Sequence, residues 1–271
     1  MEIAQNGCQT SGVTPLIDTH CHLNLSDAFP EPWPVLDAAE KAGVGACVLI
    51  GIDGESSVRA VEMAEADPRL FAVVGWHPNY ASSCTEDRLG EIERLLEHRK
   101  VVALGEIGLD YHWDYATPER QKEIFLAQLE IAAAHKAPVV LHCRKAYGDL
   151  LDILDARAPH SYLFHCFSGD ETDAARAAKL DAYFGVDGPI TYKNARALRE
   201  IFKGLPHDRI LIETDSPYLT PEPHRGKPNS PAMLPLINAG LAATLGLTED
   251  ACATLTKENA LRFFSRMAVA S

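Results

Sequence analysis

The sequence predicts an α/β protein built as a single (β/α)8 barrel. Eight short apolar runs of strand length alternate along the chain with segments of helical spacing. Most of these runs are continuously apolar, as is typical of parallel strands covered on both faces. A doubly wound open sheet is the alternative, but no Gly-rich phosphate loop of the Rossmann or Walker type follows any run, which disfavours it. One barrel of ~250 residues accounts for a chain of 271.

The eight runs are expected to be the barrel strands. By residue number they are 16–20, 46–51, 70–77, 101–107, 138–143, 162–167, 183–186 and 210–215. The segments between them are amphipathic, as the spacing of Leu89, Ile92 and Leu96 illustrates. Residues 1–15 are polar and lack periodicity, so we expect a loose leader before a barrel domain of residues 16–271.

Local signals place two helix ends and one long loop. The triplet 117–119 (Thr-Pro-Glu) supplies an N-cap residue, a proline at the first position and an acid, which predicts a helix start there. That helix must end before Pro138, and Gly43 predicts the end of the first helix. The Pro-rich stretch 216–231 follows the last strand and is the candidate substrate loop, because long irregular loops are usually functional or disordered.

Composition limits the classes of function. The formal net charge of -13 argues against broad, sequence-independent adhesion to nucleic acid, which needs a Lys/Arg surface. No apolar run approaches the ~18 residues of a membrane span, and no secretory signal opens the chain, so we expect a cytoplasmic protein without a membrane. Seven scattered cysteines without a CxxC pair predict neither a disulfide framework nor a structural zinc site.

Two histidines one residue apart end the first expected strand. Side chains alternate along a strand, so His20 and His22 would point together into the barrel mouth. A cysteine directly follows a strand-end histidine at three places, Cys21, Cys143 and Cys166. The same alternation predicts that these thiols point away from the mouth and pack in the protein interior.

Other strands also end in polar residues of the types that bind metal. The strand-end residues are His20, His22, His77, Glu106, His142, His165 and Asp215. In a barrel these side chains converge on one mouth, and buried charges persist only when they are paired or bound to metal. With His77 set aside, four histidines and two carboxylates form a nitrogen and oxygen donor set suited to zinc, manganese or magnesium.

The size of this donor set predicts two divalent ions. A catalytic zinc takes about three protein ligands and keeps one position open. Two ions ~3.5 to 4 Å apart need a bridging carboxylate, and Glu106 on the fourth strand is the candidate. The two ions would outweigh the charges of Glu106, Asp215 and a hydroxide, leaving a cationic centre that attracts phosphate.

At these residues the chain resembles the TatD family of metal-dependent hydrolases in the amidohydrolase superfamily, from about Leu16 to Phe264. The matching motifs, in order, are IDTHCHL, GWHP, GEIGLDYH, PVVLHCR, FHCFSG, ETDSPYL, GKPNSP and ENALRFF. Within GKPNSP, Ser230 stands where many relatives carry a larger polar residue, so substrate contacts from this loop are the loosest part of the resemblance.

The resemblance implies a TIM barrel that hydrolyses phosphodiester bonds as a deoxyribonuclease with a two-metal site. By position, the resemblance implies that one metal is held by His20, His22, Glu106 and Asp215. It implies that the other metal is held by Glu106, His142 and His165. His77 resembles a histidine that contacts substrate phosphate. Many superfamily relatives bridge their metals with a modified lysine, so Glu106 favours the TatD family over the others.

The expected substrate is DNA at a strand end, or a small phosphoester. Because the overall charge is unfavourable for DNA, we expect binding through the metals and a few contacts from His77, Arg144 and Arg225. A barrel mouth admits a strand end more easily than an uninterrupted duplex, which predicts an exonuclease preferring single-stranded or frayed ends. The resemblance implies that it is of the 3′-5′ type. Asp215 is predicted to act also as the general base for the attacking water.

Two other functions remain open from the sequence. The same metal site could hydrolyse a carbonyl ester or amide, such as an aminoacyl-tRNA-like ester. A non-catalytic metal-binding protein would be expected to lack a ligand, and none is missing here. The sequence leaves the oligomeric state open, and a monomer would suffice.

Overall fold

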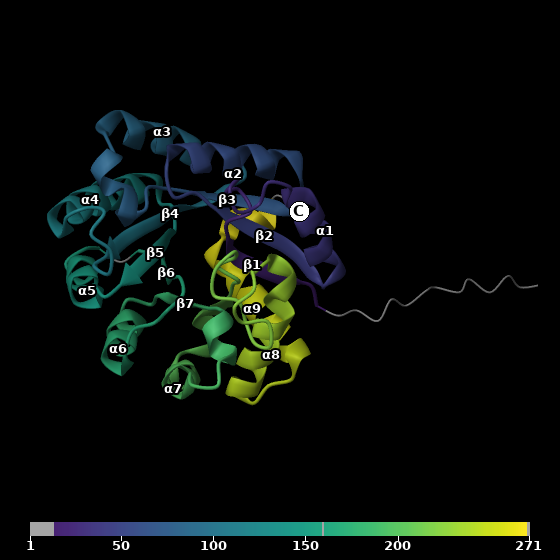
Figure 1. Ribbon diagram of the computed structural model, residues 1–271. Helices are drawn as coiled ribbons and strands as arrows, with labels where there is room; N and C mark the ends of the chain where they lie inside the picture. The colour runs from purple at the N-terminus through teal and green to yellow at the C-terminus, as the bar shows by residue number, and fades with distance from the viewer. Residues whose placement is uncertain (1–13, 159, 270–271) are drawn as a thin grey trace, which may run out of the picture.

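The computed structural model describes residues 14–158 and 160–269 and shows eight parallel strands ringed by helices (Figure 1). The strands are β1 (Leu16–Cys21), β2 (Val44–Ile50), β3 (Leu70–Val74), β4 (Val101–Asp110), β5 (Val139–Arg144), β6 (Tyr162–Phe164), β7 (Tyr183–Val186) and β8 (Ile210–Ile212). Each strand pairs in parallel with the next in the chain. The predicted barrel is confirmed, and the doubly wound alternative is wrong because the strand order never reverses.

The barrel closes between β8 and β1, beside the predicted ligands. The backbone N–H of Asp215 donates to the carbonyl of His20 at 2.9 Å, and that of His22 donates to Ser216 at 2.9 Å. The Asp18 carboxylate adds a brace by accepting from the backbone N–H (2.9 Å) and the hydroxyl (2.6 Å) of Thr214. These contacts fix the segment after β8 against His20 of β1 and His22 just after it.

Helices cover the outside of the barrel. They are α1 (Pro32–Lys41), α2 (Gly54–Ala66), α3 (Glu86–Leu96), α4 (Pro118–His135), α5 (Tyr147–Asp155), α6 (Glu171–Lys179), α7 (Arg196–Gly204), α8 (Leu234–Leu245) and α9 (Glu249–Phe263). Short 3-10 turns include η1 (Pro78–Ser83) after β3 and η5 (Ser265–Val269) after α9. The predicted helix start is confirmed, since Thr117 caps α4, and so is the end of α1 before Gly43, whose φ is +95°.

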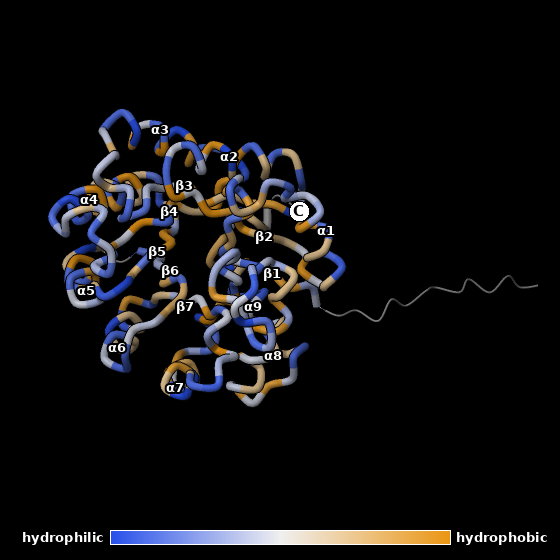
Figure 2. The backbone as a smooth tube through the Cα atoms, in the orientation of Figure 1, coloured by the Kyte–Doolittle hydropathy of each residue, from blue (hydrophilic) through white to orange (hydrophobic). Residues whose placement is uncertain are grey.

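The apolar core has two layers. Side chains between strands and helices form the outer layer, and the hydrophobic segments of Figure 2 gather in the strands. The inner layer fills the barrel with residues such as Ile17, Val73 and Leu211, and it continues into Phe264 and Met267 at the C-terminal end of the described chain. The polar strand ends therefore lie above a filled barrel, not above a pore.

Several strand ends differ from the prediction. β3, β6 and β8 end before His77, His165 and Asp215, whereas β4 extends to Asp110. Asp215 has a φ of 51°, in the left-handed region that ends an extended strand, and so does Cys166, next to His165, with 45°. His77 leaves the ladder because its backbone precedes the 3-10 turn η1 and its ring caps that turn.

Two predictions concern the chain as a whole. The leader expected at residues 1–15 falls mainly on residues 1–13, outside the described residues, while Thr14 bonds to Thr254 of α9 at 3.1 Å. The domain boundary therefore stays a prediction. Within the described ranges no single helix is long and apolar enough to cross a membrane; one pair of segments, Pro231–Leu245 and Glu249–Phe263, passes that test jointly but is bent by 103°. The cytoplasmic location stays a prediction.

Candidate metal centre

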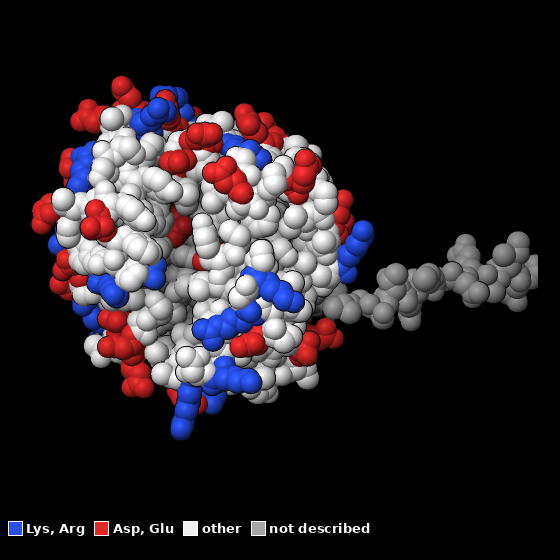
Figure 3. Space-filling model, viewed as in Figure 1, with Lys and Arg blue, Asp and Glu red and all other residues white. Residues whose placement is uncertain are grey.

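The polar strand ends surround an open cavity of about 690 Å³ at the mouth of the barrel. His22, His77, Glu106, His142, His165 and Asp215 all line it. His20 lies beneath them and is fully buried. Figure 3 shows a hollow at the centre of the face it views, with acidic atoms inside and Lys or Arg side chains along parts of its edge. The structure thus brings together all six predicted metal ligands and His77.

Glu106 is at the centre of this cluster and is 3% exposed. Its Oε2 lies 3.4 Å from Nε2 of His20. Its Oε1 lies 2.7 Å from Nδ1 of His142 and 3.2 Å from Nε2 of His165. The two oxygens of one carboxylate therefore face two different groups of imidazoles, which is the arrangement that a bridging ligand requires.

A second carboxylate completes the His20 side of the cluster. Asp215 Oδ1 lies 3.4 Å from Nε2 of His22 and 3.7 Å from Nε2 of His20. The ligand-type atoms of these three residues lie within 4.8 Å of one another, and the same holds for His20, Glu106 and His165. Both groups are buried and made of nitrogen and oxygen donors, which suit a divalent ion.

His20 provides the test of whether a metal fits. Its Nδ1 and Nε2 are both buried, and neither has a hydrogen-bond partner among the described residues. A buried polar atom without a partner costs free energy, so such atoms are usually satisfied. The Nε2 of His20 points between two carboxylates, and its ring stacks at 3.7 Å on that of His165. A divalent ion between these carboxylates would satisfy this nitrogen.

The other predicted ligands have one ring nitrogen fixed by an acceptor. His142 Nε2 donates to Asp110 (3.1 Å), and His165 Nδ1 donates to Glu213 (3.0 Å). His22 Nδ1 lies 3.3 Å from the carbonyl of Ile50, which can only accept. In each ring the second nitrogen is thereby directed into the cluster, as in the carboxylate–histidine–metal arrangement of known metal sites.

His77 differs from these rings because the nitrogen that it presents to the cavity carries the proton. Its Nδ1 accepts the backbone N–H of Asn79 at 3.1 Å, so the proton of the neutral ring is on Nε2. That Nε2 lies 3.7 Å from Glu106 and faces the cavity. Burial, together with the charge of His142, lowers the pKa of His77 to about 3, so the ring is neutral at pH 7. His77 can therefore donate a hydrogen bond to a ligand in the cavity, whereas its nitrogens are poorly suited to a metal.

The charges in the cluster stabilise one another. Burial alone would raise the pKa of Glu106, but the neighbouring His165, His20 and His77 hold it well below its usual value. Burial likewise opposes protonation of His165, yet Glu106 and Glu213 raise its pKa well above the ordinary value. A divalent ion entering the cluster must displace protons from such rings, so metal binding is coupled to proton release.

Sequence reasoning missed Asp110 and Glu213, the carboxylates that orient two of the ligands. A period-2 signal existed for both, because Asp110 is four residues after Glu106 on β4 and Glu213 is two residues before Asp215. Gly185 on β7 makes room for Glu213: a Cβ there would lie 2.5 Å from its carboxylate oxygen. The position of Glu213 thus depends on a contact between strands, which the sequence does not show.

One other expectation about the mouth needs correction, and the predicted substrate contact of Arg225 stays a prediction. Cys166 does not turn away from it but lines the cavity and is half-buried, because its left-handed backbone breaks the strand alternation. Arg144 lines the cavity as predicted, whereas Arg225 is not among the described residues that line it; its guanidinium lies 4.2 Å from the ring centre of Tyr192.

The 216–231 loop is held by buried Asn229, which donates to the carbonyls of Thr214 and Tyr218.

We expect Glu213→Gln to lower metal affinity by about 10- to 100-fold, the usual effect of losing a carboxylate behind a ligating histidine. Glutamine keeps the shape and an acceptor for the Cys166 N–H, but it removes the charge that polarises His165. Titration of the metal-free protein with zinc or manganese measures the change. Exposed Glu200→Gln is the matched control, and an unchanged affinity in Glu213→Gln would show that this carboxylate is not needed for binding.

Comparison with known proteins places this geometry in context. The family model described as TatD related DNase matches residues 17–265. The metal-dependent hydrolase YabD of Bacillus subtilis, described as uncharacterized, is 39% identical over 251 residues, which cover 92% of this chain and 98% of that protein. A protein of Erwinia tasmaniensis named 3′-5′ ssDNA/RNA exonuclease TatD is 33% identical over 258 residues, covering 92% of this chain and all of that protein.

The fold has a close counterpart among solved structures. The crystal structure of YJJV, a TatD homologue from Escherichia coli K12, superposes with a TM-score of 0.88 at 31% identity. The alignment covers 94% of this chain and 99% of that one. The similarity therefore extends over nearly the whole described barrel and includes the strands that carry the cluster.

Proposed function

Because this chain belongs to the TatD-related DNase family, a family of metal-dependent hydrolases, we propose that it is a phosphodiesterase that shortens single-stranded DNA from its 3′ end. One observation carries the proposal: Glu106 presents one oxygen to each of two ligand groups. Such a carboxylate suits two adjacent divalent ions, the usual arrangement for in-line displacement at phosphorus.

The ligands divide between the two groups as follows. His20, His22 and Asp215 would hold one ion with Oε2 of Glu106, and His142 and His165 would hold the other with Oε1. The donor atoms are compatible with zinc, manganese or magnesium. When bound, the ions supply positive charge to the phosphate oxygens and lower the pKa of the attacking water.

The side chains of this chain do the remaining work. Asp215 lies beside the open cavity, orients the water and takes its proton as the water oxygen bonds to phosphorus and the bond from phosphorus to the leaving O3′ breaks. The leaving O3′ takes up a proton from solvent and becomes the 3′-hydroxyl of the shortened strand. The pKa of Asp215 is lowered, since the His22 hydrogen bond and nearby imidazoles outweigh burial, so the carboxylate is ionised and can accept. His77 Nε2–H donates to a phosphate oxygen, and Arg144 at the cavity wall pairs with a neighbouring phosphate.

The substrate assignment rests on charge and access. With a net charge of -13, the protein lacks a broad cationic surface for duplex DNA, so positive charge is concentrated at the ions and a few side chains. The Erwinia tasmaniensis relative is named a 3′-5′ ssDNA/RNA exonuclease, which supports the direction of shortening and the preference for a single strand. RNA with the same free 3′ end is the related substrate to compare.

We expect rapid shortening of a linear single strand and no cleavage of a covalently closed circle of the same sequence. A strand end can enter the mouth, but a circle presents no end. Gel analysis of both substrates with added manganese or magnesium decides this. Equal cutting of the circle would contradict the exonuclease assignment, and hydrolysis of a carboxylic ester without any phosphodiester cleavage would favour the carbonyl-hydrolase alternative.

Salt dependence gives a second, quantitative test of the same assignment. If only two or three phosphates are engaged, log affinity should fall with log salt with a slope of about -1.4 to -2.1, at roughly -0.7 per phosphate for a single strand. Fluorescence anisotropy over a salt series, with the ions present and a cleavage-resistant phosphorothioate strand as the ligand, measures the slope. A much steeper slope would mean that the protein tracks many phosphates along the strand.

A further inference from the structure

Exposed aromatic side chains are concentrated around the mouth of the barrel. The exposed fractions are 43% for Tyr80, 44% for Trp113, 60% for Tyr115 and 55% for Tyr218. All four line the same cavity as the candidate metal centre. Large aromatic side chains gain free energy when they are covered, so a group of four around one cavity suggests a ligand with flat, apolar faces.

The four rings are placed by three different segments. Trp113 and Tyr115 follow β4 and stack on each other with ring centres 5.8 Å apart and an interplanar angle of 26°. Tyr80, in η1, lies 6.3 Å from the ring of His77. The fourth ring, Tyr218, follows β8 and lies 6.1 Å from the ring of His22. The aromatic rim therefore adjoins the metal centre on more than one side.

Backbone contacts hold the Trp113 side of this rim. The hydroxyl of Ser82, in η1, donates to the carbonyl of Tyr115 at 3.0 Å. Arg120 at the start of α4 donates to the carbonyl of Ala81 at 3.1 Å. These bonds tie the loop after β4 to the 3-10 turn, so the stacked pair is ordered before a ligand arrives.

One cation lies beside the stacked pair. The Arg144 guanidinium is 5.7 Å from the ring centre of Trp113 and also lines the cavity. A nucleotide combines a flat base with a charged phosphate, and an aromatic ring beside an arginine matches both parts. Because the net charge is -13, phosphate contacts alone give this protein little attraction for a strand, so base stacking would have to supply much of the affinity.

We propose that Trp113 and Tyr115, with Tyr80 and Tyr218, form a base-stacking site for the terminal nucleotides of a single-stranded nucleic acid. This inference rests on the proposed function and adds the reason for its strand preference. Bases of a duplex are already stacked and paired, whereas those of a single strand are free to stack on protein rings. The site is tolerant of sequence, because every base has a flat face.

The first test compares steady-state kinetics of single variants on a short linear DNA strand. Trp113→Ala and Tyr115→Ala should each raise KM by roughly 5- to 100-fold, as expected for the loss of one base stack. Trp113→Phe should retain most of the affinity, because it keeps a flat ring. An unchanged KM in both alanine variants would overturn the stacking site.

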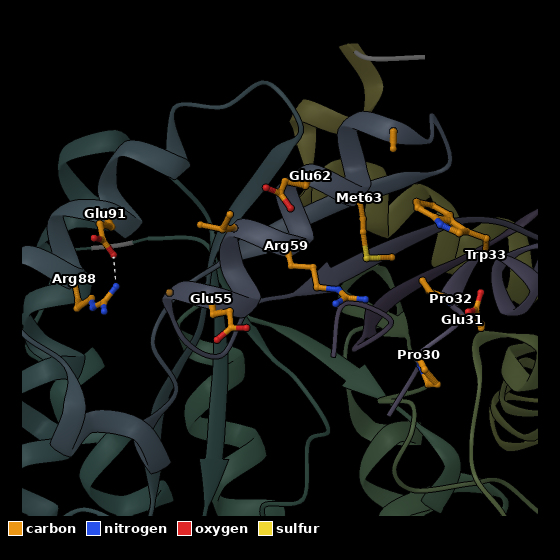
Figure 4. Close-up of a pocket in the computed structure, with 13 residues that line it drawn as sticks. Pro30, Glu31, Pro32, Trp33, Glu55, Arg59, Glu62, Met63, Arg88 and Glu91 are labelled. Carbon is orange, nitrogen blue, oxygen red and sulfur yellow. Dashed lines mark hydrogen bonds and ion pairs between the residues drawn. The ribbon is translucent and has the colours of Figure 1, made fainter. Parts of the chain in front are cut away.

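Trp33 offers the matched control for removal of an exposed tryptophan. It is 41% exposed and lines a separate groove with residues such as Arg59 and Met63 (Figure 4). Trp33→Ala should leave KM for DNA unchanged. A rise equal to that of Trp113→Ala would mean that any exposed tryptophan affects binding, and would count against a site at the mouth.

A base-free substrate tests for stacking itself. For wild type, an abasic strand with the same phosphates should show a rise in KM at least as large as the rise that Trp113→Ala shows on normal DNA, because all base stacks are then lost. On the abasic strand, Trp113→Ala should raise KM little above the wild-type value, since the contact that it removes is already absent. Fully additive losses would mean that Trp113 contacts something other than a base, which would overturn the proposal.

Binding without turnover separates this proposal from the proposed function. In chelator, a Trp33→Phe protein keeps buried Trp76 and exposed Trp113, and single-stranded DNA should quench its fluorescence; the further change Trp113→Phe should abolish the quenching. If wild type cleaves DNA, but DNA does not quench the Trp33→Phe protein and the alanine variants keep the wild-type KM, only the stacking site fails. If wild type neither cleaves nor binds DNA, the proposed function fails and the stacking site with it.

Discussion

Replacing Glu106 by glutamine is expected to abolish hydrolysis while the barrel remains folded. The substitution keeps the side-chain shape but removes the charge between the two ligand groups, and an amide nitrogen cannot replace the second oxygen as a ligand. Loss of even one ion should lower turnover by at least about 10³-fold, because a catalytic ion contributes several kcal/mol of charge stabilisation.

Metal-dependent stabilisation provides a readout of Glu106→Gln that does not depend on activity. An ion present at 100 times its Kd stabilises the wild-type fold by about 2.7 kcal/mol, which raises Tm by roughly 5 °C or more in a chain of this size. The variant should lose most of this shift yet melt cooperatively. Glu91→Gln, an exposed carboxylate on α3 paired with Arg88, is the control. Near wild-type turnover and a full metal-induced shift would contradict the bridge.

The fold could be predicted because its signal is local and repeated. Each strand is a short apolar run and each helix has an amphipathic spacing, so eight repeats of the same pattern leave few arrangements. The ligand positions followed from the same regularity, since polar residues at strand ends meet at one mouth. His20 at the end of β1 and His22 just after it both face the cluster, as the period-2 spacing predicted.

The parts that could not be predicted depend on contacts between distant segments. The left-handed backbone of Cys166 ends the alternation and places this residue in the lining of the cavity. Glu213 and Asp110 orient ligands on other strands, and the position of Glu213 depends on the space left by Gly185. The contact of Arg225 with the ring of Tyr192 likewise joins separate segments, and its substrate role stays a prediction.

The hydrogen bonds of the rings distinguish the two roles suggested for histidine, metal ligand and substrate contact. From the sequence, His77 differs from His142 only in its motif. In the structure the ring of His77 accepts from a backbone N–H, whereas that of His142 donates to Asp110, so their free nitrogens have opposite hydrogen-bonding character. This difference supports His142 as a ligand and His77 as a substrate contact, both of which stay predictions.

Asp215→Asn is expected to lower kcat by roughly 10²- to 10⁴-fold, the range typical of general acid-base groups. Asparagine keeps an oxygen near His22 and His20, so one ligand atom remains, but the amide cannot take a proton from water. The effect should therefore fall on kcat more than on KM, because ground-state binding of the substrate is retained.

The pH profile distinguishes the loss of a base from the loss of a ligand. Since the pKa of Asp215 is lowered in the folded protein, the carboxylate is ionised at neutral pH, and activity should fall only as pH drops through that low pKa. In Asp215→Asn this acid limb should disappear at equal metal content, measured by elemental analysis. If the substitution mainly raises KM, or if its effect vanishes once the metal content is restored, Asp215 acts as a ligand and not as the base.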